Sequence, residues 1–436
     1  MSDLQLERAR GLFEQGIEKF QGKDYKGAQE RFEAALELAP DRATVLNNLA
    51  ACLIRNGDAK RALEVSRRSV GIDPGNPDGW VNVAASLCAE KKFREAKEAA
   101  QKALALNPRD SDAWHHVGYC CFAFGEATEA LRAYDKALEA NPSLTEAMFG
   151  TGTIFATLKY RHAALLCFEK CLALEPNHAP AHFARATLLQ ELDRREDAIA
   201  AYQQALHHKH PDVRDIQYSL ASLGVGQTPD RPPASYVTRL FDAYAANFED
   251  HLRKSLNYRV PELINKVLTE RGIRNARFLD LGCGTGLVGK LVGDRCKLLV
   301  GVDLSEKMLE IARSKQCYDE LHKADLVEHL GTTTGTYDVV CAADVLNYFG
   351  DLRPVFAAVL GVLARGGLFI FTVEEPVGPQ EGDFALQSTM RYTHSKGYCE
   401  HAADKSGFAR IDAMPVVLRI ESGRPVAATC FALHRA

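Results

Sequence analysis

The chain has 436 residues, more than one ordinary domain holds, which favours two or three domains. Hydrophobic residues make up 46% and charged residues 25%, the balance of a globular protein, and a formal net charge of −4 gives no reason to expect a nucleic acid as partner. No apolar run is long enough to span a membrane, and the chain opens without a signal-like segment. The 12 cysteines lack C-x-x-C pairs and zinc-ligand spacing, so we expect no metal site, buried free thiols and a reducing, cytoplasmic location.

The first half of the chain repeats every 34 residues. Prolines recur at this interval at Pro40, Pro74, Pro108, Pro142 and Pro176. Small residues recur in the same way at Gly16, Ala50, Ala84, Gly118, Gly152 and Ala186. Each repeat predicts two amphipathic helices, such as 114–124 and 127–139, with the proline ending the second. One pair cannot bury its apolar face by itself, so neighbouring pairs are expected to stack into a continuous core.

These spacings resemble the tetratricopeptide repeat. Six repeats would cover roughly residues 9–211, and the segment 213–223 predicts a capping helix, which together give an all-α solenoid over residues 1–223. The resemblance implies a protein or peptide partner held in the groove formed by the first helix of each pair. Asn48 and Asn82 occupy the same position in successive repeats, and an asparagine amide can bond both groups of a peptide backbone. The alternative is that both asparagines are exposed or bond locally.

A linker and an α/β domain are expected after the solenoid. Residues 224–235 contain turn formers and prolines, the pattern of a domain boundary. Residues 236–436 then alternate between strand and helix patterns, with strands expected at 277–281, 298–303, 337–342 and 368–373, a weaker one at 320–323, and a late pair at 416–420 and 427–434. This alternation predicts a mostly parallel sheet covered by helices on both faces, with the late pair as an antiparallel edge.

One glycine-rich turn follows the first expected strand. The strand ends at Asp280, and Gly282, Gly284 and Gly286 follow, so the third glycine comes one residue earlier than in the dinucleotide fingerprint G-x-G-x-x-G. The second strand ends in Asp303, where a carboxylate can accept hydrogen bonds from the two ribose hydroxyls of an adenosine. Asp325 follows the third strand and is placed to accept from an adenine amino group.

This order of motifs resembles the Rossmann-like class I methyltransferase fold, which uses S-adenosylmethionine. Six tetratricopeptide repeats followed by FDAYAANFEDHL and RYTHSKGY also resemble a bacterial group of repeat-containing methyltransferases of the type 11/12 kind. The resemblance implies that the glycine loop holds the methionine part of the cofactor, that Asp303 holds the ribose, and that the adenine lies against residues after the second and third strands. The implied cofactor-binding residues are Asp280, Gly282, Cys283, Gly284, Gly286, Asp303, Leu304, Met308, Asp325 and Leu326. Tyr244 and Arg259 are further expected partners of the cofactor carboxylate, although Tyr244 is equally well explained by packing on the sheet.

The methyl acceptor is expected beyond the carboxyl ends of the strands. Asn347 and Tyr348 after the fourth strand, and Arg391 after the fifth, are candidate acceptor-binding residues. Tyr392 and His394 are candidate catalytic residues, with His394 as a base near neutral pH. The alternative is that both are structural parts of a lid that includes the polar, turn-rich segment 376–390.

Three functions are consistent with these patterns. The first is a methyltransferase whose solenoid recruits a protein partner or substrate. The second is a methyltransferase for a small molecule or sugar, with the repeats used for assembly; it predicts that the second domain keeps its activity without the repeats. The third is a non-catalytic scaffold whose second domain senses S-adenosylmethionine, which predicts cofactor binding without product. The acceptor itself cannot be derived from the fold.

Overall fold

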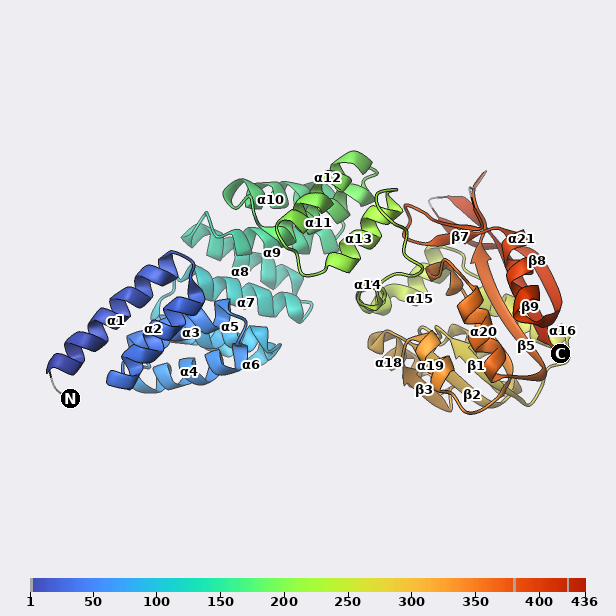
Figure 1. The fold of residues 1–436 in the computed structure, drawn as a ribbon, viewed down its shortest axis with the longest axis horizontal. Coiled ribbons are helices and arrows are strands. Elements are labelled where there is room, and N and C mark those ends of the chain that lie inside the picture. Colours follow the sequence, from blue (N-terminus) through green and yellow to red (C-terminus); the bar gives the residue numbers. More distant parts are fainter. Residues whose placement is uncertain (1–2, 379–381, 422) are drawn as a thin grey trace. The chain divides into compact units, whose positions relative to one another are not determined.

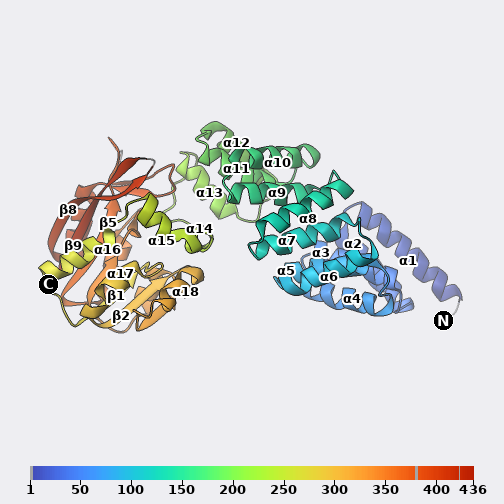
Figure 2. The ribbon, with the colours of Figure 1, turned by 180° about the vertical axis from the view of Figure 1, so that it is seen from behind.

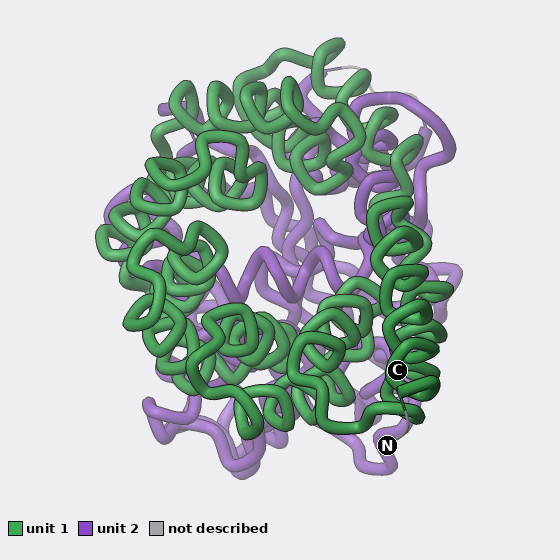
Figure 3. The backbone as a smooth tube through the Cα atoms, turned by 90° about the vertical axis from the view of Figure 1, so that its left-hand side faces the viewer, with its two compact units in different colours: residues 1–210 green, residues 211–436 purple. Residues whose placement is uncertain are grey.

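The computed structural model describes residues 3–378, 382–421 and 423–436. Two compact units divide the chain, residues 1–210 and residues 211–436 (Figure 3). None of the helices in these described ranges is long and apolar enough to cross a membrane.

The first unit consists of six antiparallel helix pairs (Figure 1). The helices are α1 (Asp3–Gln21), α2 (Tyr25–Leu38), α3 (Ala43–Arg55), α4 (Ala59–Ile72), α5 (Pro77–Ala89), α6 (Phe93–Leu106), α7 (Ser111–Ala123), α8 (Ala127–Ala140), α9 (Thr145–Thr157), α10 (Arg161–Leu174), α11 (Ala179–Glu191) and α12 (Arg195–His207). From the third pair onward, the first helix of each pair begins 34 residues after that of the pair before it, as Pro77 does after Ala43. The expected helical-repeat solenoid is therefore confirmed.

Side-chain size explains the recurring small residues. A Cβ atom added to Gly118 would lie 2.7 Å from the ring of Tyr134, sixteen residues later in the second helix of the pair. Gly152 meets the Phe168 ring in the same way, at 2.6 Å. In the repeat that carries Ala84, the position sixteen residues later is Ala100. At Gly118 and Gly152, the missing Cβ thus leaves the space that a ring from the partner helix fills.

The described residues of the second unit form a nine-stranded sheet. Its strands are β1 (Ala276–Leu281), β2 (Cys296–Asp303), β3 (Glu320–Lys323), β4 (Tyr337–Ala342), β5 (Leu363–Glu374), β6 (Phe384–Leu386), β7 (Tyr392–His394), β8 (Phe408–Glu421) and β9 (Arg424–Arg435). The longer helices are α13 (Val213–Ser222), α14 (Ala234–Tyr244), α16 (Val260–Glu270), α17 (Leu287–Val292), α18 (Glu306–Ser314), α19 (Leu326–Thr332), α20 (Arg353–Val362) and α21 (Lys396–Ser406).

The sheet is parallel in its centre and antiparallel at one side. The strand order runs β3-β2-β1-β4-β5, and all of these pairs are parallel. Strand β9 pairs antiparallel with β5, and β8 pairs antiparallel with β9. Helices α19, α20 and α21 pack on one face, and α16 and α17 on the other (Figures 1 and 2). The predicted fold class, an α/β domain with an antiparallel edge, is confirmed.

Three segments differ in detail from the expectations. Helix α13, expected as the solenoid cap, is grouped with the second unit, where the Tyr218 hydroxyl donates to the Met390 carbonyl at 2.8 Å. The segment 241–256, which begins with the FDAYAANFEDHL motif, is not one continuous helix: α14 ends at Tyr244, and a 3-10 turn, the short α15 (Phe248–Asp250) and a π turn (His251–Ser255) follow. The segment 376–390 contributes β6, while its residues 379–381 lie outside the described ranges.

Candidate functional site

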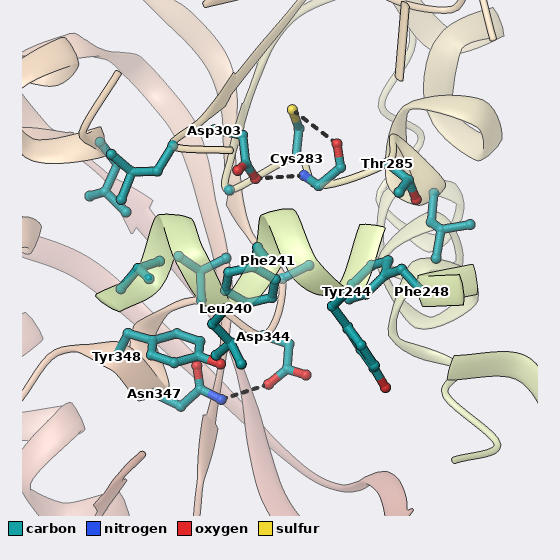
Figure 4. Close-up of a pocket in the computed structure, with 18 of the residues that line it drawn as sticks. Leu240, Phe241, Tyr244, Phe248, Cys283, Thr285, Asp303, Asp344, Asn347 and Tyr348 are labelled. Carbon is teal, nitrogen blue, oxygen red and sulfur yellow. Dashed lines mark hydrogen bonds between the residues drawn. The ribbon is translucent and has the colours of Figure 1, made fainter. Parts of the chain in front are cut away.

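A cavity of about 580 Å³ lies in the second unit at the carboxyl ends of the parallel strands. Its walls come from the glycine-rich turn after β1, from Asp303 at the end of β2, and from the segment that follows β4. In Figure 4, α14 runs across the cavity, with Asp303 on one side of the helix and Asp344 on the other. Parallel strands bring their carboxyl ends to one edge of the sheet, which is why residues so far apart in the sequence meet here.

The glycine-rich turn has a backbone that requires glycine. Gly282, Gly284 and Gly286 have φ angles of +67°, +53° and +83°, in the left-handed region that other residues rarely adopt. The amide of Gly282 donates to the Val302 carbonyl at 2.8 Å, which ties the turn to β2. A Cβ atom at Gly282 would also lie 2.4 Å from Val345. Gly282, Cys283 and Gly284 line the cavity, whereas Gly286 belongs to the turn but not to the lining.

Asp303, at the end of β2, is hydrogen-bonded to the glycine-rich turn. Its Oδ2 accepts from the Gly284 amide at 2.9 Å, and its Oδ1 accepts from the Ser305 amide at 2.8 Å (Figure 4). Burial raises the pKa of Asp303, and these backbone hydrogen bonds oppose that rise. Each carboxylate oxygen accepts more than one hydrogen bond, so the Asp303 side chain keeps acceptor capacity toward the cavity.

Asp280 also lines the cavity and is almost completely buried. Its Oδ2 accepts from the Tyr318 hydroxyl at 2.6 Å, and its Oδ1 has no hydrogen-bond partner among the described residues. Burial raises the pKa of Asp280 to about 7, the Tyr318 bond lowers it, and nearby Asp303 raises it further. Tyr318 was not predicted, because its loop position after α18 carries no recognisable pattern. Its ring fills the space beside Gly286 and Gly289, where an added Cβ would lie 2.9 and 2.4 Å from it.

Asp325 lies at the cavity rim and caps α19. Its Oδ1 accepts from the Val327 amide at 2.9 Å, and Arg231 donates to both carboxylate oxygens at 3.1 Å. Leu304 and Leu326 line the cavity near it. Met308 is fully buried in α18 and is not among the lining residues, so it does not reach the position expected for the adenine.

Helix α14 supplies an apolar wall that the sequence did not single out. Val237, Leu240 and Phe241 line the cavity together with Tyr244. Tyr244 packs against the rings of Phe248 and His251, and Figure 4 shows its hydroxyl directed away from the glycine-rich turn. Arg259 is not among the lining residues and donates to Asn257 at 3.3 Å. Neither side chain is therefore placed at the turn in this structure.

A buried ionic cluster forms the end of the cavity opposite the glycine-rich turn. We call it the acidic cluster; its members are Asp344, Asn347, Glu374, Arg391, Arg419 and Glu421. Asn347, Tyr348 and Arg391, expected at the acceptor, all line the cavity. The sequence analysis did not predict Arg419 or its acidic partners. The one signal that could have indicated them is Arg419 itself, a charged residue within the apolar strand pattern before Glu421.

The two candidate catalytic residues lie away from the cavity lining. His394 is fully buried in β7, its Nε2 lies 2.9 Å from the Gly350 carbonyl, and burial lowers its pKa to about 4. Tyr392 is also fully buried, and its hydroxyl donates to the Pro229 carbonyl. Both side chains are hydrogen-bonded to backbone carbonyls and enclosed by protein. They are therefore structural, and we do not place a base at His394.

The two groove candidates of the first unit have local partners. The Asn48 amide donates to the Thr44 carbonyl one helical turn away at 2.9 Å. The Asn82 amide donates to the Asn47 carbonyl at 3.1 Å and so connects neighbouring repeats. Both side chains are half-buried.

Comparison with known proteins agrees with both units. The family model described as a methyltransferase domain matches residues 279–371, and models of the tetratricopeptide repeat match residues 13–77, 87–159 and 162–227. The chain carries tetratricopeptide repeats and a class I methyltransferase domain. The methyltransferase match begins within β1 and ends within β5, so it contains the glycine-rich turn and Asp303 but not the acidic residues Glu374 and Glu421.

Curated relatives of the chain are methyltransferases. A malonyl-[acyl-carrier protein] O-methyltransferase from Geobacter sulfurreducens is 32% identical over 137 residues, which are 30% of this chain and 48% of the relative. A ubiquinone biosynthesis O-methyltransferase from Aromatoleum aromaticum is 31% identical over 23% of this chain and 45% of its own length. The chain thus spans about half the length of the curated relatives it matches.

Solved structures resemble each unit at low identity. A S-adenosylmethionine-dependent methyltransferase from Clostridium acetobutylicum is 18% identical, with a TM-score of 0.35, over 45% of this chain and 99% of its own. The tetratricopeptide-repeat protein YrrB is 22% identical, with a TM-score of 0.30, over 42% of this chain and 94% of its own.

Proposed function

We propose that the methyltransferase domain binds S-adenosylmethionine and transfers its methyl group to an acceptor that enters beside the acidic cluster. The observation that carries the proposal is the pairing of the glycine-rich turn with Asp303 on one cavity wall. A buried carboxylate oxygen of Asp280, without a partner among the described residues, adds an acceptor that suits an ammonium group.

The residues at the cavity suit each part of this cofactor. Asp303 would accept from the ribose hydroxyls, and the missing side chain of Gly284 leaves room for the methionine part. Leu304 and Leu326 offer apolar contacts for the adenine, and Asp325 offers an acceptor for its amino group. When bound, the sulfonium group supplies an already activated methyl group. The chain's own task is then to align the acceptor and exclude water, which α14 supports by covering the cavity with apolar side chains.

The repeats are proposed to hold a protein partner. Large apolar side chains are exposed in the central repeats, among them Phe124, Leu158, Tyr160 and Leu166. These side chains offer apolar contacts to such a partner.

A transfer assay tests the proposal. The full-length protein is incubated with methyl-labelled S-adenosylmethionine and a cell extract that has been separated into protein and small-molecule fractions. Label in the protein fraction supports transfer to a protein recruited by the repeats. Label in the small-molecule fraction favours the second candidate, which the name of the ubiquinone relative supports. Cofactor binding without label in either fraction would contradict transfer and leave the sensing function.

A further inference from the structure

The acceptor end of the cavity carries an excess of negative charge. Two guanidinium groups, Arg391 and Arg419, meet three carboxylates, Asp344, Glu374 and Glu421. The ionised cluster therefore has a net charge of −1. No other cation of the described residues is paired with these carboxylates. A further anion placed here would meet uncompensated negative charge in a poorly hydrated site.

Most hydrogen-bond donors of Arg419 bond carboxylates of the acidic cluster. Arg419 is 4% exposed; its Nη1 donates to both oxygens of Asp344 at 3.0 and 2.9 Å. Its Nε donates to Glu421 at 2.6 Å, and its Nη2 donates to Glu374. Four hydrogen bonds thus commit this guanidinium to carboxylates of the protein, and only one of its five N–H groups is left for a carboxylate of a ligand.

The Asn347 side chain has a fixed orientation. Its Nδ2 donates to Asp344 Oδ1 at 2.9 Å and to Glu374 Oε1 at 3.1 Å. Two carboxylates can accept only from the NH₂ end of the amide, so the assignment of nitrogen and oxygen is not open to a flip.

The amide oxygen of the Asn347 side chain has no donor within the acidic cluster. Asn347 is 2% exposed and lines the cavity, and its Oδ1 has no hydrogen-bond partner among the described residues. Figure 4 shows this oxygen on the side of the amide away from Asp344, toward Tyr348. A buried acceptor without a donor costs free energy until a donor arrives.

The rest of this end is aromatic and apolar. Phe241, Tyr348 and Tyr258 line the cavity, and the rings of Phe241 and Tyr348 lie 5.8 Å apart. Aromatic faces favour neutral or cationic groups over anions, because their π-systems carry negative charge.

On the basis of the proposed function, we infer that the methyl acceptor is a hydroxyl or amine that donates a hydrogen bond to Asn347 Oδ1, and that it is not a carboxylate. In the transfer, a bond forms between the methyl carbon and the acceptor oxygen or nitrogen as the bond from carbon to sulfur breaks. The acceptor's proton leaves to solvent. The sulfonium charge disappears in the same step, so charge is balanced.

The chemical stability of the transferred label tests this inference on the unaltered chain. A methyl ester, the product of a carboxylate acceptor, releases volatile methanol in mild alkali, whereas a methyl ether or a methylamine does not. We expect the label to remain non-volatile. Hydriodic acid would then release methyl iodide from an ether, and label retained on a cation-exchange resin would mark an amine. Volatile methanol would overturn the inference while leaving the proposed function intact. An absence of transfer by a protein that binds the cofactor would overturn both.

Substitutions at Asn347 test its role as the acceptor of the hydrogen bond. Asn347→Leu is expected to lower transfer about tenfold, equivalent to about 1.4 kcal/mol, because a buried hydrogen bond to the acceptor is lost, while affinity for S-adenosylhomocysteine is unchanged. Asn347→Ser keeps an oxygen acceptor and is expected to recover part of the rate. Asn107→Leu, at an exposed asparagine of the repeats, is the matched control. Equal transfer by Asn347→Leu and the wild type, or a serine variant no better than the leucine variant, would contradict the assignment.

Discussion

The Gly284 amide donates a hydrogen bond of 2.9 Å to Asp303 Oδ2, joining the glycine-rich turn after β1 to the acid at the end of β2. This bond fixes the position of Asp303 relative to the turn, and the two together would hold neighbouring parts of the cofactor. A second bond, from the Ser305 hydroxyl to Asp242 Oδ1 at 2.5 Å, connects the end of β2 to α14 above the cavity. The three elements around the cavity are therefore held together before any ligand arrives, which lowers the cost of ordering on binding.

Replacement of Gly282 by alanine tests the need for glycine in the turn. The residue has a φ of +67°, and the new Cβ would lie 2.4 Å from Val345. We expect a loss of at least about 2 kcal/mol in the free energy of unfolding, from backbone strain together with overpacking. Urea denaturation measures the loss. Gly361→Ala in α20 is the control, since an added Cβ there meets nothing within 4 Å, and it is expected to stabilise by about 0.5–1 kcal/mol.

Replacement of Tyr318 by phenylalanine tests the support of Asp280. Burial holds the pKa of Asp280 at about 7, above its ordinary value of 3.8, so the folded state binds an extra proton between pH 4 and 7. Stability contributed by this proton is present below pH 4 and is lost as the pH rises through 7. The Tyr318 hydroxyl offsets part of that loss by bonding the ionised form. Tyr318→Phe should therefore cost about 1–3 kcal/mol at pH 8 and less at pH 5.

Denaturation of this variant at the two pH values measures the difference. The exposed Tyr160→Phe is the control and is expected to change stability little at either pH. A cost for Tyr318→Phe that is larger at pH 5 would mean that the hydroxyl bonds the protonated carboxyl instead.

Replacement of Arg419 by methionine tests the acidic cluster. The change leaves Asp344, Glu374 and Glu421 with one guanidinium among them. Removing one partner of a buried ionic group typically costs about 3–5 kcal/mol, because the remaining charges stay buried. Arg410→Met on the same strand is the control, because Arg410 is 70% exposed in its pair with Asp412 and should cost less than about 1 kcal/mol. Thermal denaturation of both variants makes the comparison, and equal midpoints would show that the cluster does not stabilise the fold.

Replacement of Gly118 by alanine tests the packing of the repeats. Its Cβ would lie 2.7 Å from the Tyr134 ring, so we expect a cost of about 1–3 kcal/mol. In Gly118→Ala/Tyr134→Ala, the pair becomes the one that Ala84 and Ala100 form in the repeat before it. The double variant should lose less stability than the sum of the two single variants, and additive losses would argue against direct packing.

Sequence patterns predicted the architecture well because each pattern acts locally. Prolines 34 residues apart end one helix in each repeat, and glycines at 282, 284 and 286 permit a turn that other residues cannot form. The acidic cluster could not be predicted, because it joins Asp344, Asn347, Glu374, Arg391 and Arg419 from the segment after β4, from β5, from the segment before β7, and from β8. Which charged residues meet depends on strand order and on the antiparallel edge, and sequence spacing does not reveal those distances.

The placement of His394 shows the same limit. A histidine after the fifth expected strand was a reasonable base by residue type. The structure instead pairs its ring with the Gly350 carbonyl in a fully buried position. Residue type indicated the chemistry that His394 could perform, and only its surroundings decide whether a substrate can reach it.

Calorimetric titration of the full-length protein with S-adenosylmethionine, comparing wild type, Asp303→Asn and Asp404→Asn, is the most direct measurement of the central claim. Asp404 is an exposed acid on α21 and serves as the matched control. We expect one cofactor per chain in the wild type and the control, and an affinity at least about tenfold weaker in Asp303→Asn, because about 1.4 kcal/mol of hydrogen bonding to the ribose is lost. Absence of binding to the wild type, or equal affinity of all three proteins, would contradict the assignment of this cavity to the cofactor.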